Sequence, residues 1–571
     1  MSWLGARPPK WIEVLGPATL QQPVFAGWPL HVKRVPTISL RALEQLPGGT
    51  ATLERLQQAT KWLVSDDAYS AVATTTSQRT PATSLSDEFV DQLVSHGIIA
   101  PVARADIRGH VNVFGIPEFA KQRIRCIKEP RDINRVIGKD KLMKLRFPTK
   151  ADICGLVHKG KYFIALDFAS YYDQFPFSED VSRRFCFRKC NAYYRLLKLA
   201  AGLRGACEAA HCSTERMLDF DPTCATEAIM DNVIFVHDDD AIVIADTTTF
   251  VDRVKQVNGL LNEDVSDIAA LVQTAGDWGG IHLDFIAKTS SLTPKIVDKA
   301  HVSWLNRGNW TWRQLAAHIG LLFWSWNIID IPIYEFFALL RFISETGRWL
   351  TEHHRDWDAP ARVWPSAWPD LEHWTTLVLR NQPRKVPQQT PPEYIVATDA
   401  SEWGWGYFAV HNRTGTIHTF GAPWTPAFRG IYGDRLGVST FTEPQAVVNA
   451  CCHLLDPRRP VRVRIATDNT VTEAAIGRGY STRSYHINEC LRRLRQIFSA
   501  DFVFDATYLP GELNPADPLS RGVRIANREL DGDHDMSAAL RRYAGFAEPP
   551  GQSERPARGA QFAATAVAAP S

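Results

Sequence analysis

Clustered aspartates are the first residues of this sequence that could carry chemistry. The stretch VIFVHDDDAIVIA, residues 233–245, holds Asp238, Asp239 and Asp240 between two apolar runs that are typical of buried strands joined by a tight turn. Asp167 ends a similar apolar run about seventy residues earlier. Like charges on an apolar support repel one another and lose hydration unless cations neutralise them, so we expect a divalent metal site. An exposed acidic turn is the plainer alternative for the aspartate run alone.

A second acidic set lies toward the end of the chain. Its members close strand-like runs, lie in the first turn of a helix pattern or follow a fifth strand: Asp399, Glu443, Asp468 and Asp517. The helix that carries Glu443 has Pro444 next, which is tolerated at a helix start. Each acid alone is commonplace, and the set becomes informative only through its order.

Length and charge limit the class of protein that can carry these acids. With 571 residues, 45% hydrophobic and 22% charged, the chain is expected to be globular and to form three or four domains. A net charge of +2 means that a nucleic acid must meet a local basic face. Residues 121–161 hold thirteen Lys or Arg against four Asp or Glu, directly before the Asp167 strand, which suits a polyanionic substrate. An ordinary solvated surface is the alternative.

The cysteine spacing and the apolar segments indicate the cellular compartment. Ten cysteines form no Cys-x-x-Cys pair, which favours a reduced compartment over a zinc knuckle or a disulfide scaffold. The amino terminus has no apolar signal region, and the most apolar stretch, from Gly320, is interrupted by Asn327 and Asp330. We therefore expect an intracellular protein, cytoplasmic or nuclear, that is neither secreted nor membrane-bound.

Composition also divides the chain into segments. Residues 1–100 include a Ser/Thr-rich stretch, 74–86, that is typical of a loop or linker, and no role can be assigned there. Ten of the eighteen tryptophans lie between 301 and 390; they could stack on bases, but core packing is the favoured interpretation. A Pro-rich run from Asn381 marks a boundary, and residues 526–571, rich in Pro, Ala and Gly, are expected to be disordered.

Four segments between residues 120 and 300 resemble, in order, motifs of retroelement reverse transcriptases. They are RCIKEPRDIN, LDFASYYDQFPF, LAAGLRGAC and HDDDA. The resemblance implies a right-hand polymerase, with fingers and a ferredoxin-like palm over 101–300 and a thumb or connection over 301–390. It also implies an RNA template, a DNA primer and dNTPs as partners, and two Mg²⁺ ions per active site, with Mn²⁺ as the alternative ion.

The resemblance assigns the palm carboxylates. Asp167 matches the first catalytic aspartate, and the apolar AIVIA fits best if Asp239 and Asp240 are the family's aspartate pair, with Asp238 in a variable slot. These three matched acids would be both catalytic residues and metal ligands. A register that pairs Asp238 with Asp239 is the alternative.

Substrate contacts follow from the same matches. Arg125 would contact the triphosphate, Lys121 would help to hold phosphates or template, and Lys288 would donate a proton to the departing pyrophosphate, with an ordinary surface lysine as the alternative. Tyr172 would stack under the sugar and exclude a 2′-hydroxyl by size. Gly202 interrupts a helical run where a ligand could approach the backbone closely.

Residues 391–525 resemble the ribonuclease H family through the order Asp399, Glu443, Asp468 and Asp517, with TEPQA and ATDN as the specific segments. The resemblance implies two Mg²⁺ ions that activate a water to cut the RNA strand of an RNA–DNA hybrid. The hybrid would be recognised by its 2′-hydroxyls and groove shape.

The expected fold class is therefore α/β multidomain, a right-hand polymerase followed by a ribonuclease H-like domain. GRGYSTRSYHINECLRRLRQIF and NPADPLSRG look most like tyrosine-recombinase retroelements of the DIRS order, including VIPER-like elements, which implies a recombinase or structural protein from the same element as a further partner. The expected function is RNA-directed DNA synthesis with ribonuclease H activity. Two alternatives remain: a degenerate copy that binds nucleic acid without catalysis, suggested by His237 and Ala201 at motif positions, and a nuclease-only protein.

Overall fold

The chain folds into two compact units, each described here by itself. The computed structural model describes residues 27–70, 80–118, 121–137, 142–353, 356–388, 390–498 and 502–523. The amino-terminal unit contains the described residues up to Ile296 together with Pro383–Val386, and the carboxy-terminal unit contains Val297–Gln382 and the described residues from Pro387 on. The predicted α/β multidomain class is confirmed. The predicted tail, 526–571, lies outside the described residues.

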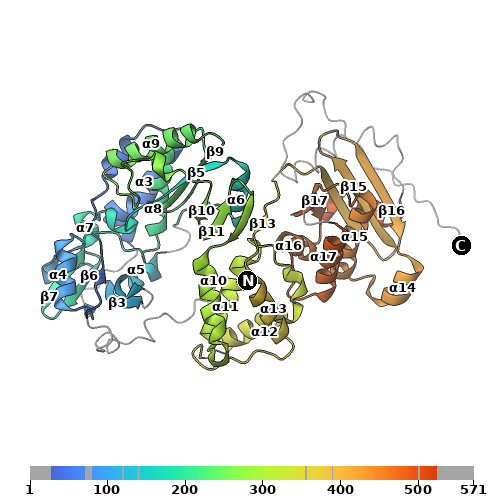
Figure 1. The fold of residues 1–571 in the computed structure, drawn as a ribbon. Coiled ribbons are helices and arrows are strands. Elements are labelled where there is room, and N and C mark those ends of the chain that lie inside the picture. The colour runs from blue at the N-terminus through green and yellow to red at the C-terminus, as the bar shows by residue number, and fades with distance from the viewer. Residues whose placement is uncertain are drawn as a thin grey trace. The chain divides into compact units, whose positions relative to one another are not determined.

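A three-stranded antiparallel sheet forms the centre of the amino-terminal unit. Its order is β5–β9–β8, with β5 at Tyr162–Asp167, β9 at Asn232–His237 and β8 at Ala225–Ile229. Helices α8 (Ala206–Leu218) and α9 (Asp240–Gln256) pack against it (Figure 1). The strands consist largely of Val, Ile, Phe and Ala, residues that fit a buried pleated surface.

The described part of this unit contains three further sheets. Their orders are β1–β4–β3, β2–β7–β6 and β10–β11–β12–β13. Their strands are β1 (Leu30–His31), β2 (Ile99–Pro101), β3 (Asn112–Glu118), β4 (Arg123–Glu129), β6 (Cys186–Lys189), β7 (Ala192–Leu196), β10 (Ala275–Trp278), β11 (Ile281–Asp284), β12 (Thr289–Leu292) and β13 (Arg384–Lys385). The remaining helices of this unit are α2 (Leu40–Gln45), α3 (Thr50–Val64), α4 (Asp87–Ser95), α5 (Arg131–Val136), α6 (Lys150–Gly155) and α7 (Glu179–Ser182).

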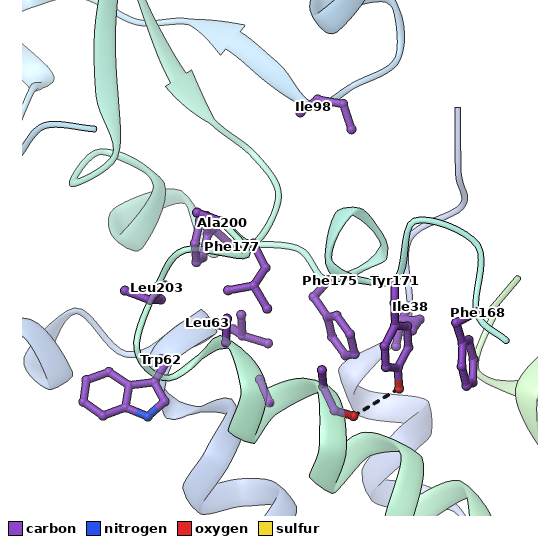
Figure 2. Close-up of a cluster of buried hydrophobic side chains, with 14 of the residues drawn as sticks. Ile38, Trp62, Leu63, Ile98, Phe168, Tyr171, Phe175, Phe177, Ala200 and Leu203 are labelled. Atoms are coloured by element: carbon purple, nitrogen blue, oxygen red, sulfur yellow. Dashed lines mark hydrogen bonds between the residues drawn. The ribbon is translucent and has the colours of Figure 1, made fainter. Parts of the chain in front are cut away.

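The described residues before position 100 belong to the same hydrophobic core as the central sheet. Ile38, Trp62 and Leu63 are buried with Phe168 and Phe175 (Figure 2). The indole N–H of Trp62 donates to Glu208 Oε2 at 2.9 Å, which ties α3 to α8. Helix α3 therefore supports α8, which packs against the central sheet, although the sequence assigned this region no role.

The stretch 233–245 is not the predicted strand pair. Strand β9 ends at His237, Asp239 caps α9 by accepting from the Ala241 N–H at 3.0 Å, and the helix begins at Asp240. Acidic residues at a helix start satisfy free N–H groups and oppose the positive end of the helix dipole. The aspartate run thus has a structural explanation as the start of a helix.

The carboxy-terminal unit opens with helices and continues into a five-stranded sheet. The helices are α10 (Pro294–Leu305), α11 (Trp312–Ser325), α12 (Phe337–Glu352) and α13 (Trp368–Arg380). Trp310 and Trp374 are buried in this part, whereas Trp349 is 41% exposed. The core interpretation of the tryptophans therefore holds for some members of the set. Within the described ranges, no helix has both the length and the hydrophobicity needed to cross a membrane.

The five-stranded sheet has the order β16–β15–β14–β17–β18. Its strands are β14 (Tyr394–Ala400), β15 (Gly404–His411), β16 (Ile417–Pro423), β17 (Arg462–Thr467) and β18 (Val503–Tyr508). Strands β14, β17 and β18 run parallel, and β15 and β16 pair antiparallel. The helices of this part are α14 (Pro426–Tyr432), α15 (Ser439–Leu454), α16 (Thr470–Arg478), α17 (Tyr485–Ile497) and α18 (Asp517–Ser520).

The two faces of this sheet carry separate cores because side chains alternate along a strand. Val396 of β14 packs with Val447 of α15 and Leu494 of α17. Ala397, one residue on, packs with Leu519 of α18. The sheet is therefore covered on both faces.

Candidate active sites

Three carboxylates converge at one end of the five-stranded sheet. Asp399 lies near the end of β14, Asp468 directly follows β17, and Glu443 projects from α15. One ligand oxygen from each of the three lies within 4.8 Å of the others. Adjacent parallel strands bring their carboxyl ends to one edge of the sheet, which is why residues about seventy positions apart meet here.

Hydrogen bonds hold this acidic cluster in place. Glu443 Oε1 accepts from the Ala400 N–H at 3.1 Å, while its Oε2 is buried without a hydrogen-bond partner. Asp399 Oδ2 accepts from the Ser520 hydroxyl. Because α15 begins at Ser439, Glu443 lies one turn inside the helix and Pro444 is an interior residue, not the predicted helix start. A buried, unpartnered carboxylate oxygen is a group that a cation would satisfy.

Glycine at position 406 lets α18 approach the cluster. Gly406 pairs with Asp399 in the sheet, and a Cβ on this glycine would lie 2.7 Å from the Leu519 Cβ. Asp517 begins α18 and pairs with Arg521 at 2.8 Å, with 42% of its side chain exposed. The close packing thus brings both Ser520 and Asp517 toward Asp399.

Burial and mutual repulsion perturb the acids of this cluster. Burial, reinforced by Asp399 and Asp468, raises the pKa of Glu443 to about 9. Burial also raises the pKa of Asp399 to about 6, against the lowering effect of the Ser520 hydrogen bond. The pKa of Asp468 is raised by burial and by Asp517. Three acids whose pKa values are raised, with Asp517 beside them, form a site that suits divalent cations with oxygen ligands.

A second acidic pair forms at the end of β5. Asp167 pairs with Asn232 across the sheet, so the β8–β9 turn, Met230 and Asp231, lies beside it. The Phe168 N–H donates to the Asp231 carbonyl at 3.0 Å, and Met230 has the positive φ of 55°. Asp231, which the sequence did not suggest, is therefore the carboxylate that the fold brings to Asp167.

The prediction that Asp239 and Asp240 complete this site is wrong for this geometry. Tyr162, at the start of β5, pairs with His237, so the aspartate run follows the opposite end of the strand from Asp167. With about 3.3 Å per strand residue, the two ends are about 17 Å apart. Neither register of the run, with or without Asp238, brings a pair of its carboxylates to Asp167.

Asp167 is held by the loop that follows α9. Its Oδ2 accepts from the Asn262 side chain at 2.8 Å, and its backbone N–H donates to Glu263 Oε2 at 2.9 Å. Its Oδ1 is buried without a hydrogen-bond partner. Burial first, and then Asp231, raise the pKa of Asp167 to about 6, and burial likewise raises the pKa of Asp231. These features resemble those of the first cluster.

Tyr172 lies at this turn. Its hydroxyl approaches Met230 Sδ at 3.3 Å and Cys207 Sγ at 3.7 Å. The neighbouring Tyr171 is buried between Phe168 and Phe175, and its hydroxyl pairs with Thr214 at 2.9 Å (Figure 2). Tyr172, and not Tyr171, is therefore the tyrosine whose hydroxyl lies at the turn that carries Asp231.

Gly202 is approached closely by protein backbone. A Cβ at Gly202 would lie 2.9 Å from the Lys128 carbonyl, and the Gly202 carbonyl accepts from the Asn134 side chain at 2.7 Å. Asn134 in turn accepts from the Arg204 N–H at 3.0 Å. The RCIKEPRDIN and LAAGLRGAC segments, far apart in sequence, therefore meet, and this contact accounts for the glycine without a ligand.

The two predicted cationic contacts lie on the β3–β4 hairpin. Arg125 is 63% exposed on β4, with Glu118 at 3.6 Å, and Lys121 is exposed in the connection between the strands. Both belong to a sheet other than the one that carries Asp167. The geometry leaves them accessible to an anionic ligand and assigns them no further role.

Lys288 lies away from Asp167. Its ammonium group donates to the Val157 carbonyl at 2.6 Å and to the Gly160 carbonyl at 2.9 Å, just before β5 begins. Gly160 packs against His237, at the far end of the strand from Asp167. The predicted role of Lys288 as a proton donor at the Asp167 site is therefore wrong for this geometry.

Comparison with known proteins concerns the fold. No protein-family model and no curated protein sequence matches this chain. Three solved structures of a foamy viral protease-reverse transcriptase are similar. The dRH form in complex with dsDNA has a TM-score of 0.43 and 11% identity over 86% of this chain and 85% of that chain. The complex with dsDNA has a TM-score of 0.43 and 11% identity over 83% of this chain and 98% of that chain. The complex with RNA/DNA hybrid has a TM-score of 0.42 and 12% identity over 86% of this chain and 65% of that chain.

Proposed function

We propose that this chain is an RNA-directed DNA polymerase that also cleaves the RNA strand of an RNA–DNA hybrid, with Mg²⁺ as its cofactor. The observation that carries the proposal is the convergence of Asp399, Glu443 and Asp468, whose ligand atoms lie within 4.8 Å of one another. The meeting of Asp167 and Asp231 at one strand end supports the polymerase half. The resemblance of RCIKEPRDIN, LDFASYYDQFPF and LAAGLRGAC supports RNA as the template, and the DIRS-like segments support an origin in a tyrosine-recombinase retroelement.

In the nuclease half, Asp399, Glu443, Asp468 and Asp517 would hold the ions. Bound Mg²⁺ would supply charge for the scissile phosphate and lower the pKa of a water. The chain's own groups prepare that site: the Ser520 hydroxyl orients Asp399, and the Ala400 N–H orients one oxygen of Glu443. The other oxygen of Glu443 stays buried and unpaired, so a cation would relieve its desolvation.

In the polymerase half, Asp167 and Asp231 would hold the ions at the β8–β9 turn. Asn262 fixes one oxygen of Asp167 and leaves Oδ1 without a hydrogen-bond partner. Tyr172, in contact with Met230, would bound the nucleotide pocket and exclude a 2′-hydroxyl by its size. These roles differ from the sequence prediction in two respects: the partner of Asp167 is Asp231, and Lys288 is no longer assigned as a proton donor.

A nuclease-only protein is the second candidate, favoured by one observation. Asn232, not an acid, follows Asp231 and pairs with Asp167. Over the described part of the chain, the Asp399 cluster is the one group in which three or more acid, His or Cys ligand atoms lie within 4.8 Å. The palm acids are thus fewer and less closely gathered than those of the nuclease half.

One assay separates these functions. A labelled RNA template annealed to a DNA primer is incubated with the full chain, Mg²⁺ and dNTPs, and primer extension and RNA cleavage are followed on the same gel. We expect both products from the unaltered chain, loss of extension alone in Asp167→Asn and loss of cleavage alone in Asp468→Asn. Asp252→Asn, an exposed acid of α9, is the control for charge. Cleavage without extension would support the nuclease-only candidate. The absence of both products would overturn the proposal.

A further inference from the structure

The loop after α9 is fastened to the strand end that carries Asp167. The Asn262 N–H donates to the Asp167 carbonyl at 2.7 Å, and the Asn262 side chain donates to Asp167 Oδ2 at 2.8 Å. Glu263 Oε2 accepts from the Asp167 N–H at 2.9 Å. Three hydrogen bonds from two consecutive residues therefore hold a third carboxylate next to the Asp167–Asp231 pair.

Asn232 is the reason why the charge of Glu263 matters at this strand end. Asn232 pairs with Asp167, and its side chain donates to Asp231 Oδ1 at 3.3 Å, so the residue that follows Asp231 at this strand end is an amide and adds no negative charge. Glu263 is partly buried, and its charge adds to the effects of burial and of Asp231 in raising the pKa of Asp167. Lys33 donates to the Asn262 side chain at 3.0 Å and offsets part of this negative charge.

We propose that Glu263 supplies the third negative charge of the Asp167–Asp231 site and so compensates for the amide at position 232 in the binding of divalent cations. The inference rests on the proposed polymerase function. The unpaired and buried Oδ1 of Asp167 is the group that such a cation would satisfy, because Asn262 already occupies Oδ2. Glu263 acts through its charge and positions the site, and no direct contact between Glu263 and a cation is required.

Two variants separate this charge from the hydrogen bond that Glu263 makes. Glu263→Gln keeps an acceptor oxygen of the same reach for the Asp167 N–H but removes the charge. Glu263→Asp keeps the charge but shortens the side chain, so the hydrogen bond to the Asp167 N–H is weakened. If the charge matters, Glu263→Asp should behave more like the unaltered chain; if only the hydrogen bond matters, Glu263→Gln should.

The test measures Mn²⁺ binding by the full chain, from the electron paramagnetic resonance signal of free Mn²⁺. The parent for this test is the full chain with both Asp399→Asn and Asp468→Asn, so that the proposed nuclease site contributes little to the measured Mn²⁺ binding. We expect Glu263→Gln to weaken Mn²⁺ binding about tenfold or more, the usual range for an outer group of a metal site, and Glu263→Asp to weaken it less. Asp239→Asn, which removes one charge at the other end of β5 and keeps a good cap, should leave binding within about twofold.

The outcomes distinguish this inference from the proposed function. If Asp231→Asn weakens Mn²⁺ binding but Glu263→Gln stays within about twofold of the parent, the inference is overturned and the polymerase site stands. The inference is also overturned if Glu263→Asp is the weaker binder of the two position-263 variants. If neither Asp167→Asn nor Asp231→Asn changes binding, the proposed palm site itself fails, and the role of Glu263 fails with it.

Discussion

Neutralising Glu443 should stabilise the ion-free protein and remove its response to Mg²⁺. Burial and the neighbouring acids raise the pKa of Glu443 from the ordinary 4.5 to about 9. The folded chain therefore keeps this proton over a pH range in which the unfolded chain has lost it. Stability conferred by the group is present below about pH 4.5 and declines as the pH rises toward about 9.

The size of the effect follows from this linkage. From the pKa of this glutamate in the unfolded chain up to pH 7, the free energy of unfolding falls by about 3 kcal/mol relative to a chain with a neutral side chain at position 443. Glu443→Gln is neutral at every pH and keeps an acceptor for the Ala400 N–H. For a unit of this size, about 3 kcal/mol corresponds to a melting temperature roughly 6–12 °C higher in the absence of ions. The difference should shrink toward zero near pH 5.

Thermal unfolding followed by tryptophan fluorescence tests this prediction. The full chain and Glu443→Gln are melted at pH 5 and pH 7, with EDTA and with excess Mg²⁺. Mg²⁺ should raise the melting temperature of the unaltered chain, because it binds only the folded state, and should raise that of Glu443→Gln much less. Glu372→Gln, an exposed glutamate of α13 in the same unit, is the control. A Glu443→Gln chain that melts at the same or a lower temperature in EDTA at pH 7 would refute the reasoning.

Three further substitutions test the palm. Tyr172→Ala should raise the ratio of ribonucleotide to deoxyribonucleotide incorporation in primer extension, and an unchanged ratio would remove Tyr172 as the gate. Gly202→Ala should cost about 1–3 kcal/mol in chemical unfolding, because its Cβ would lie 2.9 Å from the Lys128 carbonyl, whereas Gly308→Ala, with open space around it, should cost little; equal costs would contradict the packing argument. Asn232→Asp should tighten Mn²⁺ binding by adding an acid opposite Asp167, and weaker binding would contradict the charge account.

The nuclease cluster could be predicted from the sequence because each of its acids has a clear local setting. Asp399 and Asp468 end apolar runs that became the parallel strands β14 and β17. Strands in that relation must bring their ends together, so local pattern and tertiary position agree. The exact turn of α15 that carries Glu443 was misjudged, because Pro444 marked a helix start that lies five residues earlier, at Ser439.

The palm was harder to predict because two signals competed. The run from Asp238 to Asp240 has three acids, whereas Asp231 stands alone between Met230 and Asn232. Buried Val243, Thr247, Phe250, Val251 and Val254 recur at helical spacing after the run. That period indicates a helix, and short apolar runs do not separate strand from helix without it. Asp231, between the ATEAI and NVIFV runs, and Asn232, which opens the second run, were the missed turn signal.

The loop at Glu263 could not have been found from local sequence. Asn262 and Glu263 follow α9 in a polar stretch, and their hydrogen bonds reach Asp167, 95 and 96 positions away. Such a contact depends on how α9 returns along the central sheet. The same holds for Lys288, whose carbonyl partners precede β5.

Primer extension by Asp231→Asn and Asp239→Asn is the most direct test of the claim that the β8–β9 turn forms the polymerase site. Both variants remove one charge, and Asn caps α9 as well as Asp does, so neither change disturbs the fold by its chemistry alone. We expect Asp231→Asn to lose extension by a factor of about 100 or more, as when a preorganised electrostatic group is removed, and Asp239→Asn to retain it. RNA cleavage by both variants serves as the control for folding. Loss of extension in Asp239→Asn with retention in Asp231→Asn would contradict the assignment and return the site to the aspartate run.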